Sequence, residues 1–122
     1  MSGERLFAVR GAIDVPRNDR ESILACTAEL VSALLERNSL AAEQVVSCIF
    51  TCTDDLDAEF PAVAARDLGF DSVPLLCTKE MSVPGAMPSV IRILIHFYAP
   101  GEHEPRPAYL GSARELRVDL ED

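Results

Sequence analysis

The chain has 122 residues, of which 20 are acidic and 11 are basic, and its formal charge at neutral pH is −9. A chain of this length can bury roughly two-thirds of its unfolded surface in one core, so we expect a single domain over residues 1–122. The acidic balance, with no cluster of Lys or Arg, argues against nucleic acid and anionic membranes as partners.

The amino-terminal residues, MSGERLFAVRGAIDVP, lack the basic start and the unbroken apolar run of a signal peptide. No later apolar run reaches the ~20 residues that span a bilayer. We therefore expect a cytoplasmic protein. Alternating apolar residues predict a first strand over residues 5–10, which ends at Gly11 and leaves Arg10 at a strand end.

A long helix is predicted over residues 19–37. Asn18, followed three residues later by Glu21, fits a capping box at its start, and Asn38 is expected to end it. Its apolar stripe has helical spacing and comprises Ile23, Thr27, Leu30, Val31, Leu34 and Leu35.

A short helical turn is expected near residues 41–44, followed by a strand over residues 45–53. Cys48 and Cys52 lie four residues apart in that strand, so about 13 Å would separate them. This exceeds the ~7 Å that a disulfide allows between Cα atoms. We therefore expect Cys26, Cys48 and Cys52 to be buried thiols in a reducing compartment.

The second half of the chain predicts the remaining elements. Pro61 suits the first turn of a second helix that stops at Gly69. A strand over residues 72–77, a turn-rich loop, a strand over residues 88–98 and a short extended segment around Tyr109 follow. The predicted fold is α+β, with a mixed five-stranded sheet, one long helix and short helical turns. Such a sheet leaves edges and an apolar face to cover, which favours oligomerisation.

Arg92 lies in the middle of the predicted strand 88–98. Period-two alternation places it on one face with Val90, Leu94 and His96, and neither face is typical of solvent. A guanidinium stays charged, and its removal from water must be compensated by an anion and by hydrogen bonds. Two partners for Arg92 remain possible. One is Glu80 as a structural ion-pair partner, and the other is a small ligand with carboxylates that faces both Arg92 and Glu80.

Other kinds of site have little support. His96 and His103 are the only histidines, and no Cys or carboxylate stands at ligand spacing beside them, so we expect no metal site. Cys77 near Glu80 has no nearby base that would make it a nucleophile. No glycine-rich phosphate cradle is present. The remaining candidates are fixed positive charges: Arg10, Arg66, Arg92 and Arg117.

Four separated motifs occur in order along the chain: VRGAI (9–13), DLDAEFPAVAARDLGF (55–70), VPLLCTKEMSVPGAMPSVIRILI (73–95) and YLGSARELRVDL (109–120). Together they resemble the trimeric, pseudo-α/β-barrel class of monofunctional chorismate mutase. The resemblance implies a homotrimer that rearranges chorismate to prephenate in aromatic amino acid biosynthesis. It also implies a reaction without cofactor, covalent intermediate or proton transfer.

The same resemblance implies roles for individual residues. Arg92 matches the arginine that contacts the ether oxygen and a carboxylate of the substrate, and Arg10 matches the arginine that grips a carboxylate. Glu80 matches the carboxylate that accepts from the ring hydroxyl, and Tyr109 matches a phenol that hydrogen-bonds the substrate. Cys77, Leu75 and Leu76 match further pocket-lining positions, and Leu116 and Arg117 match a tail segment that helps close the pocket. The adjacent subunit is expected to supply Phe60, Ala62 and Arg66.

Two positions depart from the family pattern. Val63 stands where the pattern has a basic residue, and Leu76 replaces a small hydroxyl residue. One alternative function is therefore a non-catalytic trimeric module that binds a small acid and regulates another process. A second is a trimeric imine hydrolase of similar architecture. That alternative needs a different arginine and carboxylate arrangement near the carboxyl terminus, which the sequence ELRVDLED does not show.

Overall fold

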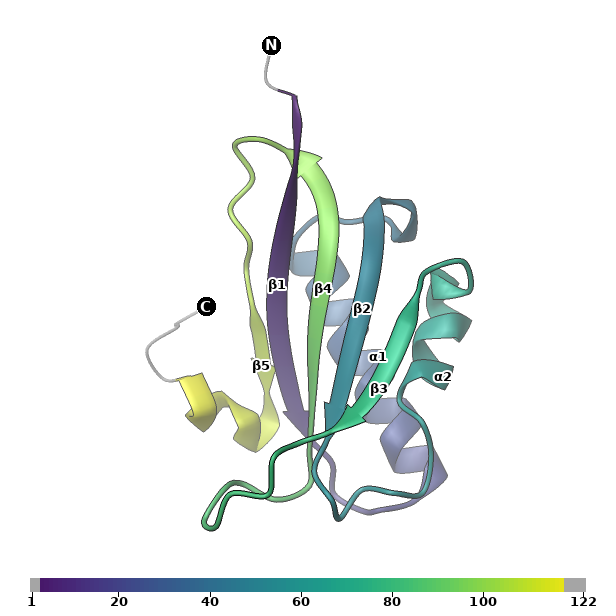
Figure 1. Cartoon of the computed structure of the whole chain (residues 1–122), viewed down its shortest axis with the longest axis vertical. Coiled ribbons are helices and arrows are strands. Elements are labelled where there is room, and N and C mark those ends of the chain that lie inside the picture. The colour runs from purple at the N-terminus through teal and green to yellow at the C-terminus, as the bar shows by residue number, and fades with distance from the viewer. Residues whose placement is uncertain (1–2, 118–122) are drawn as a thin grey trace.

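The computed structural model describes residues 3–117, with only the backbone of residue 117. It contains a mixed five-stranded sheet with strand order β3-β2-β4-β1-β5, which confirms the predicted sheet (Figure 1). The strands are β1 (Glu4–Asp14), β2 (Val45–Cys52), β3 (Leu75–Lys79), β4 (Val90–Pro100) and β5 (Ala108–Leu110).

The central strand β4 runs antiparallel to both β1 and β2, while β3 is parallel to β2 and β5 is parallel to β1. As a result, the carboxyl ends of the other four strands lie at the same end of the sheet as the start of β4 (Figure 1). Residues from five separate parts of the sequence therefore meet at that end.

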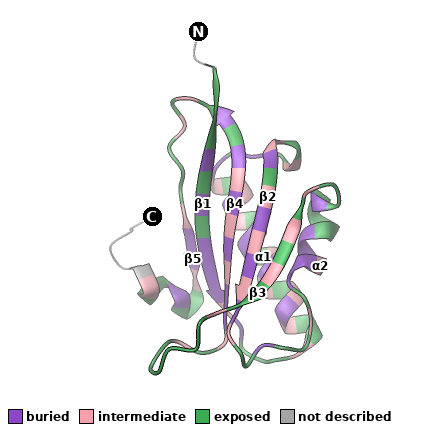
Figure 2. Ribbon diagram, viewed as in Figure 1, coloured by how far each residue is buried: buried purple, intermediate pink, exposed green. Residues whose placement is uncertain are grey.

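Both helices, α1 (Arg20–Arg37) and α2 (Ala62–Ala65), lie on one side of the sheet (Figure 1). The main core forms between this side and the apolar stripe of α1, and Figure 2 shows buried residues alternating with more exposed ones along the strands. Its fully buried large side chains include Phe50, Phe97, Ile91, Ile95, Ile23, Leu30 and Leu34. Among the described residues, no helix combines the length and apolar character needed to cross a membrane.

The opposite side of the sheet carries no long helix in the described part of the chain. A 3₁₀ turn, Gly111–Arg117, covers only the β5 edge, where Ala12, Val90, Tyr109 and Ala113 form a small second cluster. Elsewhere this helix-free face exposes large apolar side chains, listed here with their exposed fractions: Leu6 (49%), Tyr98 (46%) and Leu76 (60%). An exposed apolar sheet face of this kind is typical of a surface that another molecule covers.

The prediction that the first strand ends at Gly11 is wrong, because β1 continues to Asp14 and Arg10 lies inside it. A Cβ atom at Gly11 would lie 2.8 Å from the carbonyl oxygen of Ala108 and 3.0 Å from Cδ1 of Leu30. The glycine therefore permits a close approach of β5 and α1 to β1, which is a role that glycine has inside strands as well as in turns.

The predicted helix cap is displaced by one residue. Asp19, and not Asn18, is the N-cap of α1, and its carboxylate accepts a hydrogen bond of 2.7 Å from the backbone N–H of Ser22. This bond lowers the pKa of Asp19 below its ordinary value. Asn18 instead bonds to the segment that follows β2. The helix ends at Asn38, as predicted.

The other short elements are close to their predicted positions. A 3₁₀ turn occupies Ala42–Gln44, and α2 continues into a wider turn, Arg66–Phe70, in which Gly69 has a φ of 102° and breaks the helix as predicted. Strands β3 and β4 begin two or three residues later than expected. Ser89, whose φ is 57°, interrupts extended structure just before β4.

All four cysteines are free thiols, as expected for Cys26, Cys48 and Cys52, but Cys26 is only half-buried and not buried as predicted. Cys48 and Cys52 are buried on the helix-covered side of β2. Burial raises the pKa of Cys52 to about 11 and also raises that of Cys48. These two thiols therefore act as small apolar core residues at neutral pH.

Asp55 ties the segment after β2 to the start of β4. Its carboxylate accepts hydrogen bonds from the hydroxyl of Thr53 and from the N–H and hydroxyl of Ser89, the latter two at 3.2 and 2.8 Å. The bond from Thr53 is the main cause that lowers the pKa of Asp55. The contacts to Ser89 support a backbone conformation that L-residues seldom adopt.

We expect Asp55→Ala to lower the free energy of unfolding by about 1 kcal/mol at pH 7, a modest value because these bonds are exposed to solvent. Since the folded-state pKa is lowered, the stabilisation is present above the unfolded-state pKa and disappears as pH falls through the folded-state value. Urea unfolding of both proteins should therefore converge as the pH drops well below about 4. An equal difference at pH 7 and in strong acid would contradict this role.

Candidate active site

A pocket of about 270 Å³ opens on the helix-free face of the sheet. We call it the arginine pocket, and it is lined by Arg10, Gly11, Ile49, Thr51, Glu80, Arg92, Ile93, Leu94 and Tyr109. It brings together four residues that the sequence marks as catalytic or substrate-binding: Arg10, Glu80, Arg92 and Tyr109. These residues come from β1, the segment after β3, β4 and β5.

Strand register explains this arrangement. In β4, Arg92 is paired with Ala12 of β1 on one side and with Thr51 of β2 on the other. Tyr109 is paired with the same Ala12, so one row across the sheet holds the arginine and the phenol. Arg10 lies two residues before Ala12 and thus on the same face.

The acidic partner, Glu80, enters the pocket from the segment after β3. Its backbone N–H donates a 2.9 Å hydrogen bond to the carbonyl of Cys52, which continues the pairing of β3 with β2. Its carboxylate oxygen Oε2 accepts a hydrogen bond from the hydroxyl of Thr51 and lies 3.2 Å from Nε of Arg92. The ion pair between Arg92 and Glu80, which was one of the two possibilities left open by the sequence, is therefore present.

The exposure of this ion pair determines whether Arg92 can also contact a ligand. In the single chain, 41% of the Arg92 side chain and 22% of the Glu80 side chain are exposed, so Arg92 is half-buried. Its Nε atom is buried and has no hydrogen bond within the described residues. The exposed surface of the Arg92 side chain therefore lies at its other atoms. The pairing with Glu80 and contact with a ligand are compatible.

The charge of the arginine pocket differs from that of the whole protein. Two guanidinium groups and one carboxylate line it, whereas the chain as a whole carries a formal charge of −9. Such a local excess of positive charge favours a small anionic ligand. Tyr109 is only 7% exposed and packs on Val90 and Ala113, so its ring is held firmly in the wall.

Other residues expected at the site do not line this pocket within one chain. Cys77 is in register with Phe50, a core residue, and with Phe60 it lines a second depression of about 310 Å³. Phe60 is 66% exposed. The side chains of the remaining expected residues vary in burial: Ala62 is buried, Leu75 and Leu116 are half-buried, and Arg66 and Leu76 are exposed. Leu116 packs against the cluster that contains Tyr109, and the side chain of Arg117 lies outside the described residues.

Sequence reasoning missed Thr51, whose hydroxyl bonds to Glu80. Its place in a predicted strand gave no sign of this contact, because the sequence does not contain the register between β2 and β3. Within the described residues, no group of three or more His, Cys, Asp or Glu side chains could hold a metal ion.

Comparison with known proteins decides the family. A family model described as chorismate mutase type I matches residues 6–120. This chain belongs to the type I chorismate mutase family. The chorismate mutase AroH of Thermus thermophilus is 43% identical over 115 residues, covering 93% of this chain and 94% of the relative. The chorismate mutase AroH of Bacillus subtilis is 37% identical over 114 residues, covering 92% and 90%.

A solved structure supports the same assignment. The chorismate mutase from Clostridium thermocellum superimposes on this chorismate mutase with a TM-score of 0.85 at 38% identity, covering 90% of this chain and 99% of the other. The predicted family and fold class are therefore confirmed. The comparisons give no support to the alternative of a non-catalytic binding module.

Proposed function

We propose that this chorismate mutase rearranges chorismate to prephenate in the arginine pocket, and that a neighbouring subunit of a homotrimer completes each site. The observation that carries the proposal is the Arg92–Glu80 ion pair in a pocket also lined by Arg10 and Tyr109. The pocket lies on the face of the sheet that no long helix covers in the described residues, where a second subunit has room to dock.

Arg92 is assigned the main catalytic role. In this rearrangement the C–O bond breaks ahead of C–C bond formation, so negative charge builds on the ether oxygen. A guanidinium already held in place stabilises that charge more in the transition state than in the ground state. Glu80 holds Nε of Arg92 at 3.2 Å, so the cation does not have to reorient during the reaction.

The other polar residues bind and orient the substrate. We assign a substrate carboxylate to Arg10 and a further hydrogen bond to the phenol of Tyr109. The contacts of Glu80 with Thr51 and Arg92 both involve Oε2, so Oε1 is the oxygen that we assign to the ring hydroxyl. No proton changes place, and no covalent intermediate or cofactor takes part.

The trimer is supported by what a single chain leaves incomplete. Apolar side chains such as Leu6, Tyr98 and Leu76 are exposed on the helix-free face. The expected wall residue Phe60 points out of the single chain and lines a different depression from Arg92. A neighbouring copy would cover these apolar side chains and bring its own Phe60 to the arginine pocket. A cytoplasmic location and a single domain over residues 1–122 remain part of the proposal, and the free thiols fit a reducing compartment.

The activity is tested by following the loss of chorismate absorbance with purified protein in the absence of metal and cofactor, with prephenate as the expected product. Interfacial sites are tested by co-expressing Arg92→Ala with Phe60→Asp, which places a carboxylate next to the anionic substrate. In randomly mixed trimers, roughly a quarter of the sites combine an intact arginine pocket with an intact Phe60, so about that share of activity should return. If the mixture is no more active than the sum of its inactive parents, the site lies within one subunit.

We expect Val63→Lys to lower KM and to leave kcat nearly unchanged. Val63 is half-buried on α2, three residues after the exposed Phe60, so a lysine there can reach solvent near the proposed pocket mouth. A flexible cation attracts the dianionic substrate equally before and during rearrangement, which improves binding but not the chemical step. Steady-state kinetics measures both constants, and a tenfold rise in kcat at constant KM would disprove this placement of Val63.

A further inference from the structure

Residues 57–60, which lead to Phe60, are held by a side chain from the start of α1. Asn18 accepts hydrogen bonds from the backbone N–H groups of Asp57 and Ala58, at 3.0 and 3.1 Å. Its amide nitrogen donates a 2.7 Å bond to Oδ1 of Asp57. One asparagine thus binds two consecutive backbone amides and one side chain of a segment that lies 39 residues away.

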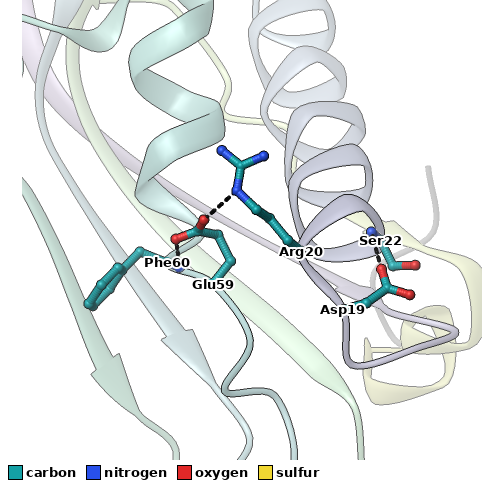
Figure 3. A network of polar contacts seen from close by, with 5 residues as sticks. All are labelled: Asp19, Arg20, Ser22, Glu59 and Phe60. Carbon is teal, nitrogen blue, oxygen red and sulfur yellow. Dashed lines mark hydrogen bonds and ion pairs between the residues drawn. The ribbon is translucent and has the colours of Figure 1, made fainter.

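A second contact reaches Phe60 itself (Figure 3). Nε of Arg20 donates a 2.8 Å hydrogen bond to Oε2 of Glu59, and Oε1 of Glu59 accepts a 2.8 Å bond from the backbone N–H of Phe60. The bond from Phe60, with that from Arg20, lowers the pKa of Glu59. The Glu59 carboxylate therefore stays ionised at neutral pH and connects the first turn of α1 to the phenylalanine.

These contacts leave little freedom to the backbone that carries the ring. Leu56 and Pro61, at the two ends of the segment, are buried, and three of the four intervening N–H groups are bonded to Asn18 or Glu59. The ring of Phe60 is 66% exposed, so packing within the chain does little to orient it. The backbone therefore sets the position and direction of the Cα–Cβ bond from which the ring extends, and the backbone is held by these side chains.

We infer that Asn18, Arg20 and Glu59 are positioning residues for substrate binding, which hold residues 57–60 so that Phe60 presents its ring to the arginine pocket of the neighbouring subunit. This inference rests on the interfacial site proposed above. An apolar wall contacts substrate and transition state about equally, so loosening it raises KM and leaves kcat little changed. A merely structural role would instead lower stability without changing either constant.

The decisive comparison is between Asn18→Ala, Glu59→Ala and the matched control Asp19→Ala. Asp19 lies between Asn18 and Arg20 and caps the same helix, but its cap bond is to Ser22, as Figure 3 shows. We expect Asn18→Ala and Glu59→Ala each to raise KM roughly 5- to 10-fold with kcat within about twofold of wild type. Asp19→Ala should lower the melting temperature and leave KM at the wild-type value.

Two further measurements make the route through Phe60 explicit. Hydrogen exchange should become faster at residues 57–60 in Asn18→Ala and Glu59→Ala, and should stay slow there in Asp19→Ala. Phe60→Ala should raise KM by itself, and adding Asn18→Ala to it should produce no further rise, because both changes act on the same contact.

The possible failures can be told apart. If Phe60→Ala raises KM and Asn18→Ala does not, the positioning role is wrong and the interfacial site stands. If exchange at residues 57–60 is unchanged in Asn18→Ala, the hydrogen bonds do not hold the segment and the inference is also wrong. If Phe60→Ala leaves KM unchanged, the proposed place of Phe60 in the site is wrong, and the inference falls with it.

Discussion

Arg92→Ala is expected to lower kcat by roughly 10² to 10³ or more, the loss seen when one preorganised donor to a developing oxyanion is removed. The protein should stay folded. The Arg92–Glu80 ion pair is partly exposed on the single chain, and exposed pairs contribute about 0 to 1 kcal/mol to stability. Thermal unfolding and turnover measured on the same preparation separate the two effects.

Lysine at position 92 should restore little of the lost activity. Its single ammonium cannot reproduce the planar fork with which a guanidinium keeps Nε beside Glu80 and presents further N–H groups to an ether oxygen and a carboxylate. A folded, trimeric Arg92→Ala protein with near-normal kcat would refute the catalytic assignment. A large stability loss at unchanged kcat would show that Arg92 serves only as the structural partner of Glu80.

Gly11→Ala should both destabilise the protein and impair catalysis. The added methyl group would lie 2.8 Å from the carbonyl oxygen of Ala108, which is backbone and cannot rotate away, and 3.1 Å from Cδ1 of Leu34. Overpacking of this kind costs about 1 to 3 kcal/mol. Relief requires β5 to move away from β1, and β5 carries Tyr109 into the arginine pocket.

We therefore expect a lower urea midpoint and a reduced kcat/KM for Gly11→Ala. The matched control is Gly3→Ala, because a Cβ atom at Gly3 meets nothing within 4 Å. This variant should behave as wild type in both measurements. Wild-type stability of Gly11→Ala would mean that β1, β5 and α1 have room between them that the structure does not show.

The elements that were predicted well are those in which apolar residues recur with a regular period along the chain. In α1, the spacing of Ile23, Leu30 and Leu34 predicts the buried stripe, and all three side chains are fully buried. In β4, alternation predicts which residues share a face, and Ile91 and Ile95 are buried on the helix side while Arg92 lies on the other. Local periodicity is a property of the chain itself, so a sequence is enough to reveal it.

The predicted strand end at Gly11 and the predicted helix cap at Asn18 were wrong because each residue type can serve more than one structural role. A glycine after an apolar strand can mark a turn or a close approach, and only the position of Ala108 shows that Gly11 serves the second use. Asn18 and Asp19 are both good helix caps. In the structure, Asp19 is the N-cap and Asn18 is bonded to residues 57 and 58. Which of the two residues caps the helix therefore depends on a segment that is distant in sequence.

The sequence by itself determined the alternation that marks Arg92, the mixed α+β composition and, through its motifs, the family. Only the tertiary structure decided that Arg10, Glu80, Arg92 and Tyr109 meet in one pocket while Phe60 stays apart from them on the same chain. The reason is strand order and register: β4 lies between β1 and β2, and β5 joins the outer edge of β1. Pairing between distant strands depends on the packing of the whole core, and no local pattern records it.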